Sequence, residues 1–233
     1  MIALVTSTLI PSNAYSYYNP DERLKQTINT IQKLYDAGFE DVYLFDNSIN
    51  TTNLESLSNT FKQLKIFNTP QYSFENKGLN EALLILNNIH VLPPNIPIFK
   101  ISGRYYPNKD FNLASYEPYP IDKDIIGVGQ FLGSKNAYFS TRAYFIKNKT
   151  VLELVLNLAI QEMLSYAKGI HGIKSFLLAI KNLFKQCVGT PYQLSLEQAF
   201  ARIAYNSNRC LLINSINVEG LVAGVNKAEF VSE

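Results

Sequence analysis

Residues 98–106 join a short apolar run to groups that can bind an anion or stack on a ring. Their sequence, Ile-Phe-Lys-Ile-Ser-Gly-Arg-Tyr-Tyr, predicts a buried strand that ends in a polar loop. Arg104 adds a permanent cation with a planar donor fork suited to phosphate or carboxylate, and Gly103 permits a close backbone approach or a positive φ. In an open α/β sheet, the loops at the carboxyl ends of the strands form the ligand crevice. The segment therefore predicts an anion-binding loop, and a structural ion pair of Arg104 is the alternative.

Polar residues also follow two other predicted strands, at residues 2–5 and 42–45. The residues concerned are Thr6, Ser7, Asp46 and Asn47. The hydroxyls after the first strand can hydrogen-bond a ligand or cap a turn. Because the carboxyl ends of parallel strands meet at one edge of a sheet, we expect all of these groups to lie near Arg104.

The helix predicted after residue 75 begins with groups that favour a negatively charged ligand. Its start contains Asn76, Lys77, Gly78 and Asn80, and Glu81 also lies in its first turn. Asn76 or Gly78 can begin the helix, and Lys77 lies beside its first turn. A helix amino terminus presents backbone N–H groups and the positive end of the helix dipole, so with a nearby lysine it favours an anion.

The apolar pattern of the first hundred residues alternates between strand and helix. Strands are predicted at residues 2–5, 42–45, 65–67 and 98–101, and helices begin at Pro20, at Asn53 and at Asn76 or Gly78. Such alternation favours right-handed crossovers and a mainly parallel sheet flanked by helices, which is the α/β class.

The second half of the chain has a different pattern. Residues 125–128 and 143–146 read as strands that could add to the sheet in antiparallel fashion, and residues 211–218 include a last strand. Helices are predicted at residues 149–167, at residues 173–185 and from Ser195, and the tail after Asn226 is predicted to be a loose terminus. This half therefore adds a small antiparallel extension and a C-terminal helical region.

The composition of the 233 residues, with 47% hydrophobic and 17% charged residues, supports one large folded domain. The net charge of +2 gives no indication of a nucleic-acid partner. Two isolated cysteines, Cys187 and Cys210, indicate neither a disulfide framework nor a metal site, and His90 and His171 match no metal-ligand spacing. Since the chain shows no signal peptide and no run of roughly 18 apolar residues, a cytoplasmic location is expected.

Taken in chain order, these motifs resemble small GT-A-type glycosyltransferases of bacterial and viral surface-polysaccharide clusters, which make lipopolysaccharide or capsule. The stretches that carry the resemblance, within residues 1–220, are Phe45-Asp46-Asn47-Ser48, Asn76-Lys77-Gly78-Leu79-Asn80-Glu81, Lys100-Ile101-Ser102-Gly103-Arg104-Tyr105, Thr141-Arg142 and Leu196-Glu197-Gln198-Ala199-Phe200. The resemblance implies a single GT-A-like domain, with residues 1–106 as the nucleotide-sugar-binding half and residues 107–233 as the acceptor and helical half. It also implies a nucleotide-sugar donor, a glycan or lipid-linked acceptor, and at most peripheral contact with the membrane.

The resemblance further implies which residues form the donor site. The implied substrate- and nucleotide-binding residues are Thr6, Ser7, Asp46, Asn47, Asn76, Lys77, Gly78, Asn80, Ser102, Gly103, Tyr105 and Arg142. The family usually has an Asp-X-Asp motif, which binds a divalent metal on the diphosphate, where this chain has Ser102 and Arg104. Arginine can supply the positive charge instead, so the departure favours transfer without a metal, with Arg104 and Lys77 stabilising the leaving group. A manganese or magnesium ion reached by Asp110 is the alternative.

A transfer that inverts the anomeric centre needs a carboxylate to take the proton from the acceptor hydroxyl. In the family this base often comes from the acidic start of a late helix, a position that Glu197 matches. Asp110 and Glu219 are reserve candidates, and compensation of the helix dipole is the structural alternative for Glu197. A retaining enzyme would need no such base.

Two other functions compete with sugar transfer. A nucleotidyltransferase that makes an activated sugar would need a glycine-rich, basic loop directly after the first strand, and residues 6–13 contain no glycine, lysine or arginine. A degenerate transferase that only binds a partner is favoured by the loss of the Asp-X-Asp motif. Such a protein would hold Arg104 and Glu197 in buried structural pairs.

Overall fold

The computed structural model of the chain describes residues 1–11, 17–72, 74, 76–130, 137–169, 172–177, 180, 194–223 and 228–233. Within these residues the larger sheet has seven strands and the smaller has three. In spatial order, the larger sheet consists of β3 (Lys65–Asn68), β2 (Val42–Asp46), β1 (Ile2–Ser7), β4 (Ile98–Ser102), β7 (Tyr138–Ile146), β6 (Ile125–Gln130) and β8 (Cys210–Ile213). The smaller consists of β10 (Ala228–Ser232), β9 (Val218–Ala223) and β5 (Tyr105–Pro107).

The parallel part of the sheet brings three strand ends together. β1 pairs in parallel with both β2 and β4, so that Ser7 lies opposite Asp46 and Thr6 lies opposite Ser102. Beyond β4 the sheet changes character, because β7 is antiparallel to β4 and β6 is antiparallel to β7. The predicted α/β class, with a mainly parallel sheet and an antiparallel extension, is therefore confirmed. We call the aligned ends of β1, β2 and β4 the carboxyl edge.

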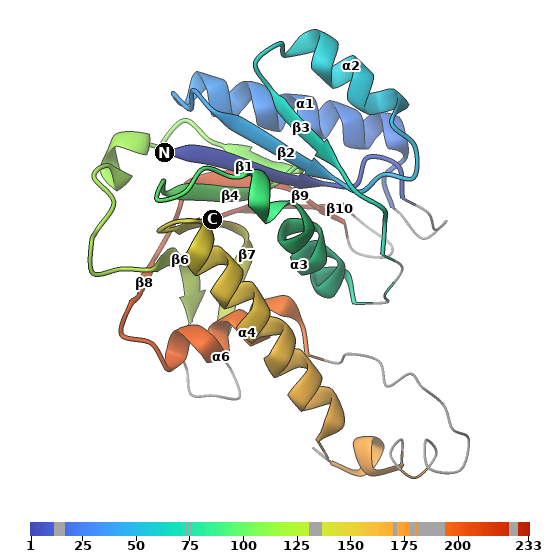
Figure 1. Cartoon of the computed structure of the whole chain (residues 1–233), viewed down its shortest axis with the longest axis vertical. Helices are drawn as coiled ribbons and strands as arrows, with labels where there is room; N and C mark the ends of the chain where they lie inside the picture. Colours follow the sequence, from blue (N-terminus) through green and yellow to red (C-terminus); the bar gives the residue numbers. More distant parts are fainter. Residues whose placement is uncertain are drawn as a thin grey trace.

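Helices cover both faces of the large sheet (Figure 1). The helices are α1 (Pro20–Asp36), α2 (Thr52–Thr60), α3 (Lys77–Asn88), α4 (Lys149–Lys168) and α6 (Leu196–Tyr205), with short 3-10 turns at Ile89–Val91 and Leu113–Tyr116. Helices α1 and α2 pack on one face, whereas α3, α4 and α6 pack on the other. Side chains alternate between the faces along a strand, so Leu4 belongs to the α3 side and Val5 to the α1 side.

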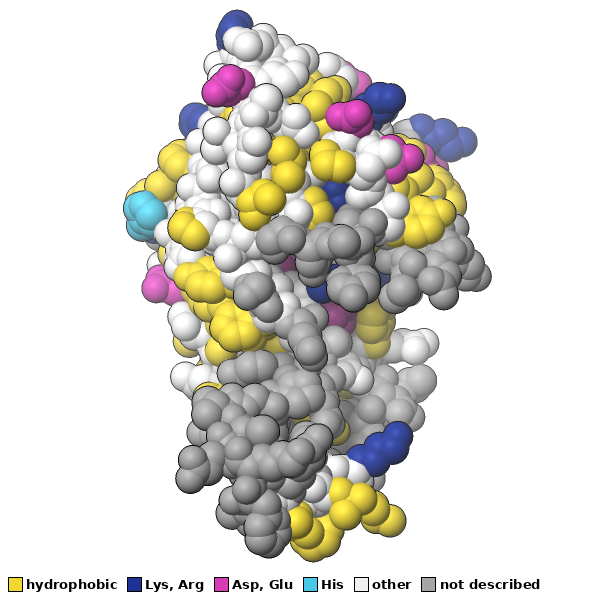
Figure 2. All heavy atoms as spheres, turned by 90° about the vertical axis from the view of Figure 1, so that its right-hand side faces the viewer, with side chains coloured by type: hydrophobic (Ala, Val, Ile, Leu, Met, Phe, Trp, Pro, Cys, Tyr) yellow, Lys and Arg dark blue, Asp and Glu magenta, His cyan; other side chains and the backbone are white. Residues whose placement is uncertain are grey.

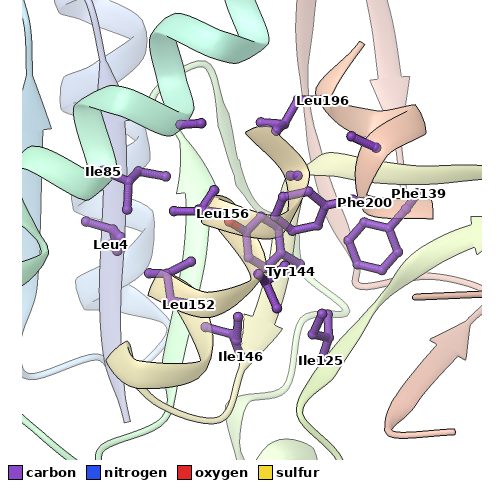
Figure 3. Packing of buried hydrophobic residues seen from close by; sticks show 14 of the residues in the cluster. Leu4, Ile85, Ile125, Phe139, Tyr144, Ile146, Leu152, Leu156, Leu196 and Phe200 are labelled. Carbon is purple, nitrogen blue, oxygen red and sulfur yellow. The ribbon is translucent and has the colours of Figure 1, made fainter. Parts of the chain in front are cut away.

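The core beneath α3, α4 and α6 is built from several elements (Figure 3). Leu4, Ile85, Leu156 and Phe200 come from β1, α3, α4 and α6, and each is at most 1% exposed. The ring of Phe200 lies 5.5 Å from that of Tyr144 on β7. This packing fixes α3 and α6 against the sheet, and both helices begin at its carboxyl edge.

Side-chain caps determine where these helices begin. Asn19 and Glu22 form a reciprocal capping box at α1, and Ser195 and Gln198 form another at α6. At α3 the Asn76 side chain accepts a hydrogen bond from the Leu79 amide at 3.1 Å. The predicted starts of all three helices are confirmed to within two residues.

Two predictions for irregular regions need correction. The tail after Asn226 is not a loose terminus, because β10 pairs with β9 from Ala228 to Ser232. Likewise, the second helix, predicted over residues 53–64, ends at Thr60, four residues early. His171, Cys187 and most of the predicted helix at residues 173–185 lie outside the described residues. Of the helices that are described, none is long and apolar enough to cross a membrane.

Candidate functional site

The carboxyl edge is the place where the predicted site residues can meet. Figure 2 looks at the side of the molecule toward which β1 and β2 run, and a few basic and acidic side chains are visible in the middle of that face. The groups come from both layers of helices. We describe the α1 side first and the α3 and α6 side second.

Asp46 organises the loops that follow β1 and β2. Its side chain is fully buried, at 0% exposure. Its carboxylate accepts hydrogen bonds from the Ser7 hydroxyl and from the amides of Leu9 and Ser48. The neighbouring Asn47 is also buried, and its side-chain oxygen accepts from the Thr8 hydroxyl. Both predicted residues therefore lie at the edge, where they act on the site through the loops that they hold.

Two arginines lie near each other on the α1 side, and we call Arg23 and Arg104 the basic side. Arg23 donates a hydrogen bond from Nη1 to the Thr8 carbonyl oxygen at 2.7 Å. Burial lowers the pKa of Arg23 to about 10, and the charge of Arg104 acts in the same direction. Among the described residues, no carboxylate lies within ion-pair distance of Arg104. The structural ion pair considered for Arg104 is thus not found in this part of the chain.

Arg23 was not among the predicted site residues, although a signal was present. A basic residue in the first turn of a helix opposes the helix dipole. Arg23 is such a residue, and α1 follows the first strand of the sheet. An unfavourable charge at a strand-to-helix connection can therefore point to an anion-binding role.

Glu81 and Lys100 form a buried ion pair on the opposite side of the edge. Lys100 is 1% exposed, and its Nζ lies 2.5 Å from Glu81 Oε1. The same carboxylate oxygen accepts from the Thr6 hydroxyl at 2.7 Å and from the Ser102 hydroxyl at 3.4 Å. Burial alone would raise the pKa of Glu81, but the charge and hydrogen bond of Lys100 outweigh it and the net pKa is lowered. Glu81 is therefore ionised at neutral pH.

Glu197 is linked to this pair through Thr141. The Thr141 hydroxyl donates to Glu197 Oε1 at 3.1 Å, and the Thr141 carbonyl oxygen accepts from Lys100 Nζ at 2.6 Å. Two carboxylates, Glu81 and Glu197, are thus held by one connected set of hydrogen bonds, and we call them the acidic side. Neither Glu81 nor Lys100 was among the predicted site residues.

Close packing of α3 against α6 brings the acidic side together. A Cβ at Gly78 would lie 2.5 Å from Leu196 Cβ, so only glycine allows this approach. Asn76 donates from Nδ2 to the Leu194 carbonyl oxygen at 2.9 Å. The described contacts of Asn76 and Gly78 therefore join the two helix starts.

The remaining predicted residues surround this centre. The Asn80 side chain accepts a hydrogen bond from the Phe74 amide and donates one to the Phe74 carbonyl oxygen. Lys77 is exposed. Gly103 packs closely against β1 without a positive φ, which confirms the close-approach alternative. Tyr105 is 3% exposed, and the Arg142 guanidinium lies 5.9 Å from its ring and pairs with Glu233.

The reserve acids lie apart from these groups. Asp110 contacts Asn108 and Asn217, and the next residue, Phe111, packs its ring 5.3 Å from Phe99 in the core beneath α1. Glu219 lies opposite Tyr106 in the small sheet. Within the described part of the chain, neither acid forms a hydrogen bond or an ion pair with Arg104 or Glu197.

The described residues do not provide a ligand set for a divalent metal. They contain no group of three histidine, cysteine or acidic side chains that could hold one. The carboxylate nearest Ser102 is that of Glu81, which already has the buried ammonium of Lys100 as its counter-ion. The residues at this strand end therefore offer a cation of their own in place of metal ligands.

Comparison with known proteins identifies the fold. No protein-family model matches the chain, and no curated protein matches it. The galactosyltransferase LgtC, solved with donor and acceptor sugar analogues, aligns with a TM-score of 0.53 and 7% identity over 94% of this chain and 86% of its own. An active-site mutant of LgtC gives the same values. The bifunctional glycosyltransferase WbbM aligns with a TM-score of 0.50 and 8% identity over 91% of this chain, which spans 38% of WbbM.

These similarities confirm the GT-A-like fold that the sequence predicted. At such low identity they concern the fold alone. The chemistry must therefore be argued from the residues of this chain.

Proposed function

We propose that the protein is a glycosyltransferase that moves a sugar from a nucleotide-sugar donor to a glycan or lipid-linked acceptor in surface-polysaccharide synthesis. The observation that carries the proposal is the division of charge at the carboxyl edge. Arg23 and Arg104 lie near each other on one side, while Glu81 and Glu197 lie on the other. A donor has a matching division, because its diphosphate is anionic and its sugar is rich in hydroxyl groups.

In this proposal the basic side binds the diphosphate. Arg104 and Arg23 stabilise the negative charge that develops as the bond between the anomeric carbon and the diphosphate oxygen breaks. Lys77 adds a flexible cation at the start of α3. No divalent metal is required, because the arginines supply the positive charge.

Glu197 is the proposed general base. It accepts the proton of the acceptor hydroxyl while that oxygen forms the new bond to the anomeric carbon. Thr141 orients Glu197 through the 3.1 Å hydrogen bond to Oε1. Because the other carboxylate, Glu81, is bound to Lys100, Glu197 is the better candidate to take a proton.

In this proposal the two halves of the chain have different functions. Residues 1–106 bind the nucleotide sugar, with Asp46, Asn47 and Ser7 shaping the nucleoside end of the site. Residues 107–233 contribute Glu197 and receive the acceptor. We place the protein in the cytoplasm, with at most peripheral contact at the inner face of the membrane and no nucleic-acid partner.

Thermal unfolding with nucleotides tests the proposal. UDP, GDP, dTDP and CMP are each added with manganese or with a chelator. A ligand at about 100 times its Kd stabilises by about 2.7 kcal/mol, which for a chain of this size corresponds to roughly 2–4 °C for each kcal/mol. We expect one nucleotide diphosphate to raise Tm in chelator, and Arg104→Ala to remove that shift while Lys25→Ala, an exposed cation on α1, retains it. A shift only with manganese would overturn the metal-free mechanism, and no shift at all would favour a partner-binding protein without activity.

A further inference from the structure

Stability alone does not account for the buried pair of Glu81 and Lys100. Removing two charges from water is costly, and apolar residues of the same volume often serve a core equally well. Yet Lys100 is 1% exposed in the middle of β4, next to the carboxyl edge. A role at the edge therefore accounts for the pair better than stability does.

The two oxygens of Glu81 differ in their surroundings. Oε1 accepts from Thr6, from Ser102 and from Lys100. Oε2 accepts no hydrogen bond from any described residue, and it is absent from the buried polar atoms that lack a partner. The Glu81 side chain as a whole is 22% exposed, and Oε2 is the carboxylate oxygen that no described group holds. One oxygen is thus fixed by the protein while the other is available to a ligand.

We propose that Glu81 binds the hydroxyl groups of the donor sugar through Oε2, and that Lys100 is the positioning residue that holds it. The proposal rests on the proposed function. It also defines the substrate class, because an ionised carboxylate only accepts hydrogen bonds, which a hydroxyl group supplies and a carboxylate on the sugar does not. The donor sugar therefore presents free hydroxyl groups to Oε2, and a uronic acid whose carboxylate occupies that position is rejected.

The hydroxyl groups of the nucleoside ribose have the same chemistry, so the location decides between the two sources. Glu81 lies on the α3 and α6 side and is joined through Lys100 and Thr141 to Glu197, the proposed base. Asp46 and the loops after β1 and β2 lie on the α1 side. The sugar that is transferred must lie beside the base, which assigns Glu81 to the donor sugar.

The experiment compares binding of a nucleotide with and without its sugar. Glu81→Gln alone would leave Lys100 buried without a counter-ion, so the double variant Glu81→Gln/Lys100→Met is used. The matched control is Asp41→Asn/Lys65→Met, which removes an ion pair with side chains 51% and 43% exposed. Calorimetry measures Kd for UDP, UDP-glucose and UDP-glucuronic acid, or for GDP and GDP-mannose if GDP is the nucleotide that stabilises the protein.

We expect the double variant to bind the nucleotide sugar about tenfold more weakly and the free diphosphate within about twofold of the unchanged protein, a tenfold change being the loss of one good interaction. The control should change neither. An equal loss of affinity for both ligands would mean that Glu81 binds the ribose or has a structural role. No loss of affinity for either ligand would show that Glu81 does not contact the ligand. Equal affinity of the unchanged protein for UDP-glucose and UDP-glucuronic acid would overturn the substrate class. If the unchanged protein bound no nucleotide at all, the proposed function would itself be wrong.

A second readout tests the positioning role of Lys100. The charged and titratable groups that influence Glu81 are Lys100, Arg104 and Tyr144, together with the Thr6 hydroxyl. In Lys100→Met the nucleotide-sugar affinity should begin to fall at a higher pH than in the unchanged protein, because Glu81 then takes up a proton more readily. Identical pH profiles would show that Lys100 does not position Glu81.

Discussion

The basic and acidic sides of the carboxyl edge differ in how their charge is balanced. On the basic side, burial and then the charge of Arg104 lower the pKa of Arg23, while the charge of Asp46 acts in the opposite direction. The described residues place no carboxylate in an ion pair with Arg104. On the acidic side, Glu81 has its own counter-ion in Lys100. The comparison shows that Arg104 is available to bind an anion, whereas on the acidic side Lys100 neutralises Glu81 and leaves Glu197 as the carboxylate without a counter-ion among the described residues.

The largest effect should follow from removing the proposed base. Glu197→Gln keeps the size of the side chain but cannot accept a proton, so we expect transfer to fall about 10²–10⁴-fold. Donor affinity should stay unchanged, because Arg23 and Arg104 are untouched. Steady-state kinetics with a saturating donor measures the loss, and Glu153→Gln, an exposed acid on α4, is the control. Full transfer activity in Glu197→Gln would show that Glu197 is not the general base.

Removing Lys100, the counter-ion of Glu81 on the acidic side, should lower the stability of the protein. Lys100→Met leaves the carboxylate of Glu81 partly buried without a partner, which costs about 3–5 kcal/mol. Glu81→Gln/Lys100→Met should recover most of that loss, since no charge is left unpaired. Urea unfolding of both variants gives the free energies. If the double variant is no more stable than the single one, the two residues are not coupled as the 2.5 Å contact indicates.

Removing a cation from the basic side should weaken binding with little effect on stability. Hydrogen bonds to a charged group contribute about 1.5–3 kcal/mol, so Arg104→Ala should bind the nucleotide diphosphate about tenfold to a hundredfold more weakly. Its Tm without ligand should stay close to that of the unchanged protein, because Arg104 forms no ion pair with the described carboxylates. A large loss of stability with normal binding would instead make Arg104 a structural residue.

The smallest expected effect is the pH dependence that comes from Glu81. Its folded-state pKa lies below the ordinary value of 4.5, so it contributes stability above about pH 4.5 that is lost as pH falls through the folded-state pKa. The Tm of the unchanged protein should therefore fall relative to that of Glu81→Gln/Lys100→Met below that pH. Thermal scans from neutral pH to pH 3 provide the comparison. Parallel curves would mean that the pair does not lower the pKa of Glu81.

The regular elements could be predicted because their signals are local. Pro20 with its acidic neighbours, Asn76 and Ser195 all precede apolar stripes, and the structure has a helix at each. β9 and β10 were missed because each becomes a strand only by pairing with a partner, and Gly220 lies where a Cβ would meet the Arg104 carbonyl oxygen. Local periodicity does not contain that information.

The candidate site likewise has features that the sequence predicts and features that only the tertiary structure decides. The sequence by itself determined that Thr6, Asp46, Ser102 and Arg104 follow strands that run in parallel, and therefore that they share an edge. Only the tertiary structure decided that Glu81 meets Lys100 and that Thr141 joins them to Glu197. These contacts connect residues from 19 to 56 positions apart through the packing of α3 and α6 on β4 and β7. Their energy depends on burial and on distances of a few ångströms, which exist only once the helices have packed on the sheet.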